Sequence, residues 1–340
     1  MKVLLISNMR PSKQKPYSGV FVLNQYNYLK KKEGIKVELF AMERTFNSRI
    51  GSVIKYLKAF IRFIPFYFKK FDVIHLHFFF PLIIIAVIYK FLRKDVKLIV
   101  TFHGSDITRN IKNELSKSIF RVIIKEVDIV ISVGEDLAQN VKSKLNRNSD
   151  YILSAGVDDQ VFYPTNEMKK YHFLFVGSFI ERKGLDLFLS AIETLNDPKL
   201  KYCFVGSGPL KKDIENLSKK FNITIYENQS QHALRTLYNQ SKFFVLPSRD
   251  EPFGLVATES LFCGTPAIVT NVGGLKLQIN DGVNGFICLT NNTKSLVEIL
   301  QKSDNLIENE YNAMVKNASS SNKEFSLSNI TEQLIKIYKS

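Results

Sequence analysis

Apolar and polar positions follow two patterns that alternate along the chain. Short, continuously apolar runs such as "KVLLIS" (2–7) and "DIVISVG" (128–134) predict strands that are buried on both faces. Between such runs, stretches such as "GVFVLNQYNYLKKKEG" (19–34) have helical periodicity and end in glycine. Since strands and helices alternate, and the strands do not alternate in polarity, the pattern predicts parallel sheets covered by helices.

The same plan occurs twice. After a polar stretch that contains Pro164, strands and helices start again at "YHFLFVGSF" (171–179). We therefore expect an α/β fold with two Rossmann-like, doubly wound domains facing across a cleft, where ligands bind at the carboxyl ends of the strands. The expected domains are residues 1–165 and 166–321, and residues 322–340 are expected to form a C-terminal helix that can cross back to the first domain.

Two apolar stretches bear on location. The N-terminal run is too short for a signal peptide, and "FFFPLIIIAVIY" (78–89) contains a proline and only 12 residues. A membrane-spanning helix needs about 20 residues, so we expect a buried helix here and a cytoplasmic protein. Cys203, Cys263 and Cys288 lie far apart in apolar contexts, which favours buried thiols in a reducing compartment.

Charge separates the two halves. Residues 1–165 contain 27 lysines and arginines against 14 acidic residues, net +13, whereas residues 166–340 contain 20 against 18, net +2. The basic half could bind nucleic acid, anionic lipid or an acidic substrate. No pattern of aromatic and basic residues on strands suggests base stacking, so nucleic acid is not an expected partner.

One segment of the basic half favours lipid. In "VIKYLKAFIRFIPFYFKKF" (53–71), cations recur at near-helical spacing, and residues 60–68 alone contain seven aromatic and isoleucine side chains. Pro65 is expected to kink the helix. This composition is typical of a helix lying in a membrane interface, and the alternative is a core helix with a basic outer face. The candidate acceptor-binding or membrane-facing cations are Lys55, Lys58, Arg62, Lys69 and Lys70. The expected location is therefore peripheral, on the inner face of the cell membrane.

Glycine-containing turns follow strands in the second half. In "VGSFIERKG" (176–184), Arg182 and Lys183 lie at the entrance to a helix, where backbone N–H groups attract anions. This arrangement suits a diphosphate, and the alternative is a solvated turn with two surface cations. Further turns of this kind are "VGSGPL" (205–210) and "NVGGL" (271–275), although G-x-G alone is a weak signal.

Two glutamates lie in the mostly apolar stretch "DEPFGLVATESLFCGTPAIV" (250–269). Glu251 is expected before the start of a helix and Glu259 within it, so the two carboxylates can reach different parts of one ligand. Carboxylate oxygens accept hydrogen bonds from vicinal hydroxyls, which suits sugar rings. The alternative is that Glu251 caps the helix and Glu259 is solvated.

Together these motifs resemble the retaining glycosyltransferases of family 4, which have the GT-B fold. The second glutamate follows the first after seven residues, in "EPFGLVATE", as in the E-x7-E motif of that family. The resemblance extends along nearly the whole chain, in the same order and spacing. The other matching motifs are "SGVFV", "TFHGSDI", "ISVGEDL", "SAGVDDQVFYP", "VGSFIERKG", "VGSGPL" and "NDGVNGF".

The resemblance implies a nucleotide-diphosphate sugar, with UDP-sugar favoured, held by the C-terminal domain, and an acceptor held by the N-terminal one. Glu259 would hold the donor ribose, and Glu251 would contact the transferred sugar beside the amides of Phe253, Gly254 and Leu255. Lys183 would neutralise the diphosphate, and His103 would lie over the donor sugar. Catalytic roles are thus expected for His103, Glu251 and Lys183. The remaining expected donor-binding residues are Gly19, Ser178, Arg182 and Gly206.

The expected reaction moves a hexosyl or N-acetylhexosaminyl unit to a lipid-linked or polysaccharide acceptor, as in capsule or lipopolysaccharide synthesis. No metal or other cofactor is expected, and retention is expected through front-face attack without a covalent nucleophile. Other readings remain open: an inactive nucleotide-sugar-binding partner subunit, or an epimerase or phosphorylase of similar plan. His75 and His77 are expected to be structural, and Asp106 is left undecided.

The chain departs from the family pattern at several positions. Ser178 stands where many members have arginine, and Arg182 is a candidate replacement. Ala155 replaces a usual asparagine, and residues 226–228 lack a frequent glycine, which affects the expected base pocket. The first loop has one glycine, Gly19, where many members have two.

Overall fold

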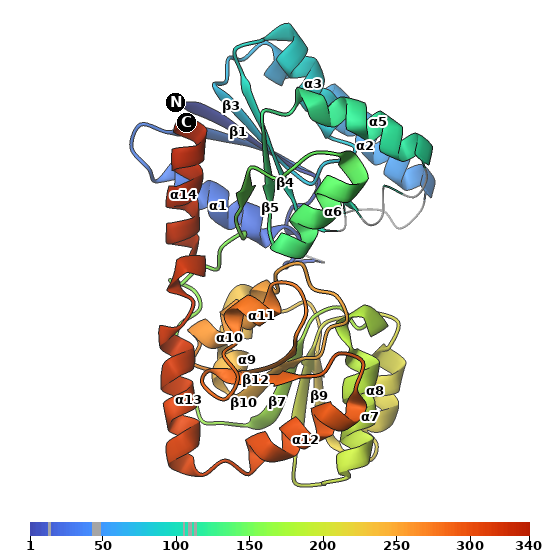
Figure 1. Cartoon of the computed structure of the whole chain (residues 1–340), viewed down its shortest axis with the longest axis vertical. Coiled ribbons are helices and arrows are strands. Elements are labelled where there is room, and N and C mark those ends of the chain that lie inside the picture. The colour runs from blue at the N-terminus through green and yellow to red at the C-terminus, as the bar shows by residue number, and fades with distance from the viewer. Residues whose placement is uncertain (13–14, 43–48, 105, 108–110, 112–113) are drawn as a thin grey trace. The chain divides into compact units, whose positions relative to one another are not determined.

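The computed structural model describes residues 1–12, 15–42, 49–104, 106–107, 111 and 114–340 (Figure 1). The chain divides into two compact units. Unit 1 consists of Met1–Gly156 and Leu327–Ser340, and unit 2 is Val157–Ser326. Residues 157–165 therefore belong to unit 2, and the final helix belongs to unit 1.

Unit 1 contains a six-stranded sheet in the order β2-β1-β3-β4-β5-β6. All of its strand pairs are parallel. The strands are β1 (Lys2–Ser7), β2 (Lys36–Ala41), β3 (Val73–His77), β4 (Lys97–Phe102), β5 (Ile129–Ser132) and β6 (Tyr151–Ile152). β2 lies on one side of β1, and β3 to β6 follow on the other side. The strand order therefore reverses beside β1, which is the position where doubly wound folds bind ligands.

Helices cover both faces of this sheet. Leu29 and Leu334 belong to one core cluster with Val3 and Ile99, so α1 and α14 lie on the same face. The right-handed crossovers of parallel strands direct α2, α3, α5 and α6 to the other face. The helices of unit 1 are α1 (Val20–Lys30), α2 (Arg49–Tyr67), α3 (Ile83–Leu92), α5 (Glu114–Ile123), η1 (Ile124–Glu126), α6 (Glu135–Leu145) and α14 (Leu327–Lys339).

Unit 2 contains a second six-stranded sheet, in the order β12-β11-β10-β7-β8-β9, and all of its pairs are parallel. The strands are β7 (Tyr171–Val176), β8 (Lys201–Val205), β9 (Asn222–Tyr226), β10 (Ser241–Leu246), β11 (Ala267–Thr270) and β12 (Gly285–Cys288). The helices are η2 (Glu181–Lys183), α7 (Leu185–Leu195), α8 (Lys211–Leu217), α9 (Gln231–Asn239), α10 (Leu255–Phe262), α11 (Leu275–Gln278), α12 (Thr293–Asp304), α13 (Glu308–Ser320) and η3 (Lys323–Phe325).

The predicted fold class, two doubly wound parallel α/β sheets, is confirmed. Central strands are buried along their whole length, as in β3, where even the histidines are inaccessible. The core of unit 2 contains stacked and edge-on aromatic rings, such as Phe173 stacked on Tyr202 and Phe188 edge-on to Tyr202. Continuous apolar runs therefore become strands covered by helices on both faces.

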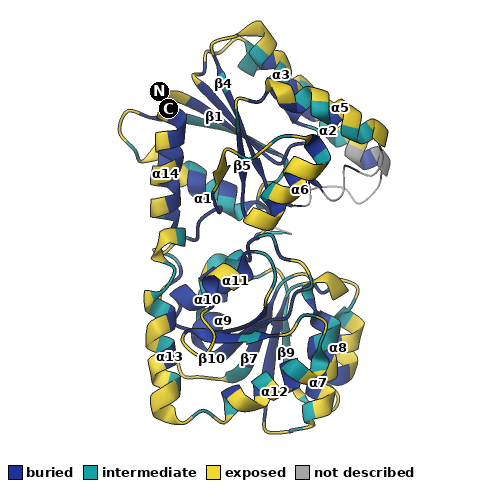
Figure 2. Ribbon diagram, in the orientation of Figure 1, coloured by how far each residue is buried: buried dark blue, intermediate teal, exposed yellow. Residues whose placement is uncertain are grey.

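The apolar stretch 78–89 differs from the prediction of a buried helix. It leads into α3, which buries Ile85, Ala86 and Tyr89 but leaves Ile88 and Phe91 exposed. Because α3 belongs to an outer layer, only the side toward the sheet is covered, and the apolar residues on its other side remain open (Figure 2). In the described ranges, no helix combines the length and the apolar character needed to cross a membrane.

Candidate functional site

The two glutamates lie where the sequence predicts, on either side of a helix start. Strand β10 ends at Leu246, a turn follows, and α10 begins at Leu255. Glu251 is buried in the turn, whereas Glu259 lies in the helix. Gly254 caps α10 with a φ of 91°, in the left-handed region that favours glycine. The turn therefore directs the chain from the end of the sheet into a helix within three residues of Glu251.

Lys183 and Glu251 form a mostly buried ion pair in this region. Lys183 Nζ donates to Glu251 Oε2, and the two side chains are 15% and 9% exposed. Lys183 comes from η2, which directly precedes α7, and Glu251 comes from the turn after β10. The fold thus places one cation and one carboxylate together at adjacent loops that follow β7 and β10, which are neighbouring strands.

Arg182 contacts an acidic residue in a similar way, at a position nearer to solvent. Its guanidinium donates to the carbonyl oxygen of Asp250 at 3.1 Å and lies 3.5 Å from the Asp250 carboxylate. Successive cations therefore contact successive acidic residues, but Arg182 is 47% exposed. Ser178, where many family members carry arginine, is exposed after β7. Whether Arg182 takes over that role stays a prediction.

Glu259 has a partner that the sequence did not reveal. Tyr238 in α9 donates its hydroxyl to Glu259 Oε2 at 3.0 Å. Desolvation raises the pKa of Glu259 to about 8, and the hydrogen bond from Tyr238 offsets part of that rise. Near neutral pH the carboxyl group is therefore largely protonated, and it can donate as well as accept hydrogen bonds. Nothing in the α9 sequence distinguishes Tyr238 from an ordinary core tyrosine.

Backbone N–H groups around the start of α10 are candidate hydrogen-bond donors. In the described part of the chain, the N–H groups of Phe253, Gly254 and Leu255 donate no backbone hydrogen bond. Such unpaired N–H groups at a helix start attract oxygen atoms that carry negative charge. They lie directly beyond Glu251 in the chain, as expected from the sequence.

Gly206 allows two neighbouring turns to touch. A Cβ atom at this position would lie 1.8 Å from the carbonyl oxygen of Gly177, which is the first residue after β7. The turns after β7 and β8 therefore pack backbone against backbone. The close contact between these turns explains why position 206 requires glycine. Contact between Gly206 and the donor remains a prediction.

In unit 1, His103 lies at the end of β4 in a loop organised by Asp106. The backbone N–H of His103 donates to Asp106 Oδ1 at 3.2 Å, and that of Gly104 donates to the same oxygen at 2.9 Å. Burial raises the pKa of Asp106 to about 6, although these N–H groups lower it. Asp106, left undecided from the sequence, thus holds the loop in shape. A carboxylate four residues after a strand end is a recognisable signal for such a turn.

His103 also contacts His77, one of the two histidines of β3. His77 Nδ1 lies 3.2 Å from His103 Nε2, whereas the ring nitrogens of His75 lie 2.7 Å from Tyr338 Oη and 2.7 Å from Thr101 Oγ1. Burial lowers the pKa of all three histidines, that of His77 to about 3, so the rings are neutral. The ring of His103 is further held between Phe21 and Phe78. Gly19 stands one residue before α1, which carries Phe21.

The cations proposed from the sequence lie in α2, at Lys55, Lys58 and Arg62, and just after it, at Lys69 and Lys70, and they have different surroundings. Lys55 donates to the carbonyl oxygen of Asn8, and Lys69 pairs with Glu38 on β2 at 2.6 Å. Lys58, Arg62 and Lys70 are exposed. Of the five cations proposed from the sequence, Lys55 and Lys69 therefore have partners within the protein, and a shared acceptor or membrane surface stays a prediction.

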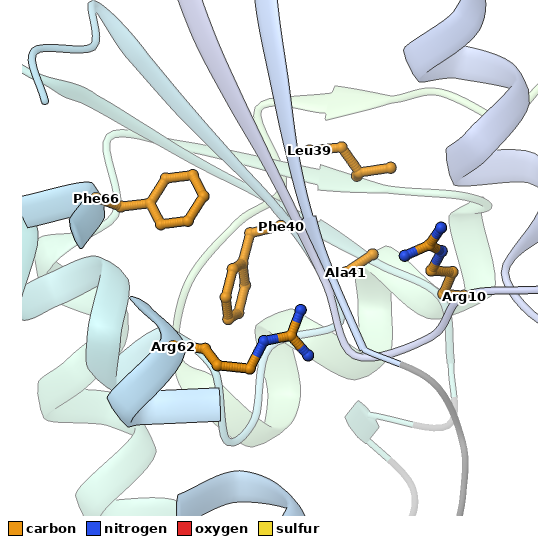
Figure 3. A pocket seen from close by; sticks show the side chains of 6 residues that line it. All are labelled: Arg10, Leu39, Phe40, Ala41, Arg62 and Phe66. Carbon is orange, nitrogen blue, oxygen red and sulfur yellow. The ribbon is translucent and has the colours of Figure 1, made fainter. Parts of the chain in front are cut away.

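Arg62 instead lines a small pocket at the end of β2. The pocket has a volume of about 130 Å³ and is lined by Arg10, Leu39, Phe40, Ala41, Arg62 and Phe66. Figure 3 shows both guanidinium groups directed toward the space beside Ala41. Guanidinium groups bind carboxylates and phosphates through charge-assisted hydrogen bonds, so a pocket lined by two of them can accept an anion.

Comparison with known proteins places the chain in a family. Residues 158–321 match the model of group 1 glycosyl transferases, and residues 18–161 match that of glycosyltransferase family 4. An uncharacterised glycosyltransferase of Methanocaldococcus jannaschii is 30% identical, and the match covers 96% of this chain and 93% of the relative. The chain therefore belongs to glycosyltransferase family 4, whose members are retaining enzymes with the GT-B fold. It is a glycosyltransferase that uses a nucleotide sugar.

Two further similarities are more distant. An uncharacterised 41.2 kDa protein in the cps region of Klebsiella pneumoniae is 27% identical, over 89% of each chain. Among solved structures, Anabaena HepE in complex with UDP and glucose is similar with a TM-score of 0.78, 14% identity, and coverage of 100% of this chain and 99% of HepE. This structural similarity shows a shared fold.

Proposed function

We propose that the protein transfers a hexosyl or N-acetylhexosaminyl unit from a UDP-sugar to a lipid-linked or polysaccharide acceptor in cell-surface glycan synthesis. The observation that carries the proposal is the buried Lys183–Glu251 pair beside the candidate N–H donors around the start of α10. A cation, a carboxylate and unpaired N–H groups are the three elements needed to hold a diphosphate and a sugar side by side.

Lys183 is the proposed partner of the donor diphosphate. In the absence of ligand, its charge is balanced by Glu251. A bound diphosphate would attract Lys183 and release Glu251 oxygens, which can then accept hydrogen bonds from the sugar hydroxyls. Arg182, nearer to solvent, adds positive charge at the same end of the strands. These fixed charges stabilise the negative charge that develops on the leaving diphosphate.

Glu259 is the proposed partner of the donor ribose. Its carboxyl group is already held by Tyr238 and is poised to exchange protons near neutral pH. Such a group can accept a hydrogen bond from a ribose hydroxyl or, when protonated, donate one to it, according to pH. UDP is the favoured nucleotide because HepE, which shares the fold, has been solved in complex with UDP and with UDP-glucose.

Transfer with retention requires no covalent nucleophile in this proposal. The bond between the anomeric carbon and the diphosphate oxygen breaks, and the acceptor hydroxyl forms the new bond on the same face of the sugar. The acceptor proton passes to the leaving diphosphate oxygen. His103, neutral and fixed by His77 and the Asp106 turn, would hydrogen-bond the transferred sugar and orient it.

The acceptor is proposed to be anionic and membrane-bound. The pocket between Arg10 and Arg62 in unit 1 suits a phosphate or carboxylate. The basic character of residues 1–165 favours an anionic membrane surface. A relative in a cps region supports a role in surface polysaccharide synthesis.

A donor screen tests the proposal. The purified chain is incubated with UDP-, ADP-, GDP- and TDP-sugars, and release of nucleoside diphosphate is measured with and without membrane extract as acceptor source. We expect release from a UDP-sugar, a fall of about 100-fold or more in Glu251→Gln, and no change in the matched variant Glu193→Gln, whose side chain is exposed on α7.

The outcomes separate the alternatives. A partner subunit would bind UDP, raising the melting temperature, without releasing it from any donor. An epimerase would convert the sugar while the nucleotide sugar stays intact. Full activity in Glu251→Gln would contradict the proposed site.

A further inference from the structure

Helix α2 has an apolar stripe on its outer side. Val53, Leu57, Ile61, Ile64 and the adjoining Phe68 are 69%, 61%, 59%, 50% and 81% exposed. Their spacing of three and four residues places them along one side of the helix. The opposite side, which includes Ala59 and Phe63, is buried against the sheet. A surface helix of a globular protein normally presents polar residues to water, so α2 is unusual in being apolar on both sides.

Helices α3 and α5 repeat this arrangement. On α3, the exposed residues are Ile84, Ile88, Phe91 and Leu92, at i, i+4, i+7 and i+8. On α5, they are Leu115, Ile119 and Val122, at i, i+4 and i+7. Three successive helices therefore each carry an outward apolar stripe with helical periodicity. We call this set of residues on α2, α3 and α5 the three-helix face.

The three helices are neighbours. Tyr67 at the end of α2 donates its hydroxyl to the carbonyl oxygen of Ile85 in α3 at 3.3 Å. Lys90 of α3 donates to the carbonyl oxygen of Glu126, directly after α5, at 2.9 Å. The rings of Phe80, before α3, and Phe120, in α5, lie 5.1 Å apart. The stripes thus belong to one helical layer on one face of the unit 1 sheet (Figures 1 and 2).

Cations surround the apolar stripes. The sequences of α2 and α3 contain no acidic residue, and Glu114 of α5 is paired with Lys117 at 2.5 Å. The exposed cations on and beside the three helices are Lys58, Arg62, Lys70, Arg93, Lys94 and Lys125. A second copy of this chain would bring the same positive charges against each other, which disfavours self-association through this face. Anionic headgroups complement both the charge and the apolar stripes.

We infer that the three-helix face inserts into the headgroup and acyl boundary of an anionic lipid bilayer. The apolar side chains enter the boundary, and the surrounding cations contact lipid phosphates. The inference deepens the proposed function, on which it rests for the location of the acceptor, by naming the surface that binds the membrane. It also extends that surface from α2, the segment indicated by sequence, to α3 and α5.

Fluorescence provides a direct test, because the full chain contains no tryptophan. The variant Phe91→Trp places one reporter on the three-helix face, and Tyr163→Trp places one on the exposed surface of unit 2. With vesicles of phosphatidylcholine and phosphatidylglycerol, we expect a blue shift and quenching by brominated acyl chains for Phe91→Trp only. Equal responses of both reporters, or no quenching of either, would overturn the inference.

A binding assay tests whether the stripes act together. The triple variant Ile61→Gln, Phe91→Gln and Ile119→Gln removes one apolar side chain from each helix without changing charge. We expect at least a tenfold loss in co-sedimentation with the same vesicles. The matched control is Met168→Gln, Leu289→Gln and Ile307→Gln, at exposed positions of unit 2, and it should bind as the unmodified chain does. Undiminished binding of the first triple variant, with its melting temperature preserved, would refute insertion.

Two further outcomes are informative. If sedimentation velocity without vesicles shows a dimer that the first triple variant abolishes, the face binds a second copy and the lipid assignment is wrong. Release of UDP from a donor in vesicle-free buffer is measured in parallel. If the unmodified chain inserts into vesicles but releases no UDP, only the proposed reaction is refuted. If it releases UDP but does not insert, only the membrane inference is refuted.

Discussion

The two units share a sheet architecture but place their unusual residues differently. In unit 2, charged groups such as Lys183 and Glu251 are brought together in buried positions at strand ends. In unit 1, apolar groups are exposed on the outer sides of three helices. The exposed large apolar residues of unit 2 are single positions without helical periodicity: Tyr163, Met168, Leu277, Val283, Leu289 and Ile307. One fold therefore supports a polar ligand site and an apolar contact surface, because function depends on the residues placed on it.

Removing the charge of Lys183 should cause the largest loss of activity while leaving the surface of unit 1 unaffected. The variant Lys183→Met is expected to lower kcat for UDP release by about 100- to 1,000-fold, since a preorganised charge for the leaving group is lost. Its effect on vesicle binding should be absent, because the three-helix face is unchanged. Steady-state kinetics and co-sedimentation of the same preparation test both parts. A loss of vesicle binding would show that the two surfaces are not independent.

The same variant should also reduce stability. Glu251 would be left as a buried charge without a partner, which typically costs about 3–5 kcal/mol. The double variant Lys183→Met, Glu251→Leu should recover stability in urea unfolding without recovering activity. Lys211→Met provides a control, because its pair with Glu227 is exposed and its loss should change stability little.

Asp106→Ala should lower the unfolding free energy and kcat by intermediate amounts, through a change confined to unit 1. Backbone N–H groups of His103 and Gly104 would lose their acceptor, which lowers the unfolding free energy by about 1–3 kcal/mol. We expect kcat to fall by about tenfold, equivalent to about 1.4 kcal/mol of activation free energy, while the affinity of unit 2 for UDP stays constant. Asp106→Asn, which keeps one acceptor oxygen, should restore part of kcat. A change in UDP affinity measured by calorimetry would argue against this role.

Glu259 should make stability depend on pH. Its pKa rises from an ordinary 4.5 to about 8 in the folded chain, so the folded state keeps a proton that the unfolded state releases. Stability should therefore fall as pH rises from about 4.5 to about 8, by at most about 1.4 kcal/mol per pH unit. Urea unfolding at several pH values would detect this slope. In Glu259→Gln the slope should be smaller, and an unchanged slope would exclude Glu259 as its source.

The smallest effect is expected on the outer side of α2. Leu57→Gln should change the unfolding free energy by less than about 0.5 kcal/mol, because the side chain is already exposed. Phe63→Ala, on the buried side of the same helix, should cost about 3–5 kcal/mol. Thermal and urea unfolding of the pair would show whether the stripe is part of the core. A large loss for Leu57→Gln would contradict the three-helix face.

The sequence was sufficient for features that depend on local signals. The alternation of runs predicts parallel sheets, and the glycine before Leu255 predicts where α10 begins, so the positions of Glu251 and Glu259 relative to the helix follow. Tyr238 could not be found in this way. It meets Glu259 only because α9 and α10 pack together, and no local pattern specifies that contact.

The exposed stripes of α3 and α5 were missed for a related reason. In the run 78–89, nearly every position is apolar, so the periodicity that usually separates an inner from an outer side is absent. Only the packing of α3 in an outer layer decides which residues are covered. The pairing of Lys55 with Asn8 and of Lys69 with Glu38 depends in the same way on the tertiary arrangement of α2.

The return of α14 to unit 1 has a consequence for biosynthesis. Ile330, Leu334 and Tyr338 complete the core on one side of the first sheet, and Tyr338 Oη lies 2.7 Å from His75 Nδ1. A ribosome produces these residues only after the whole of unit 2, whereas domains commonly fold in order as they emerge. The part of that face which α14 covers, beside α1, therefore stays uncovered until Leu327–Ser340 have left the ribosome. The nascent chain thus exposes an unfinished apolar surface throughout the synthesis of the second unit.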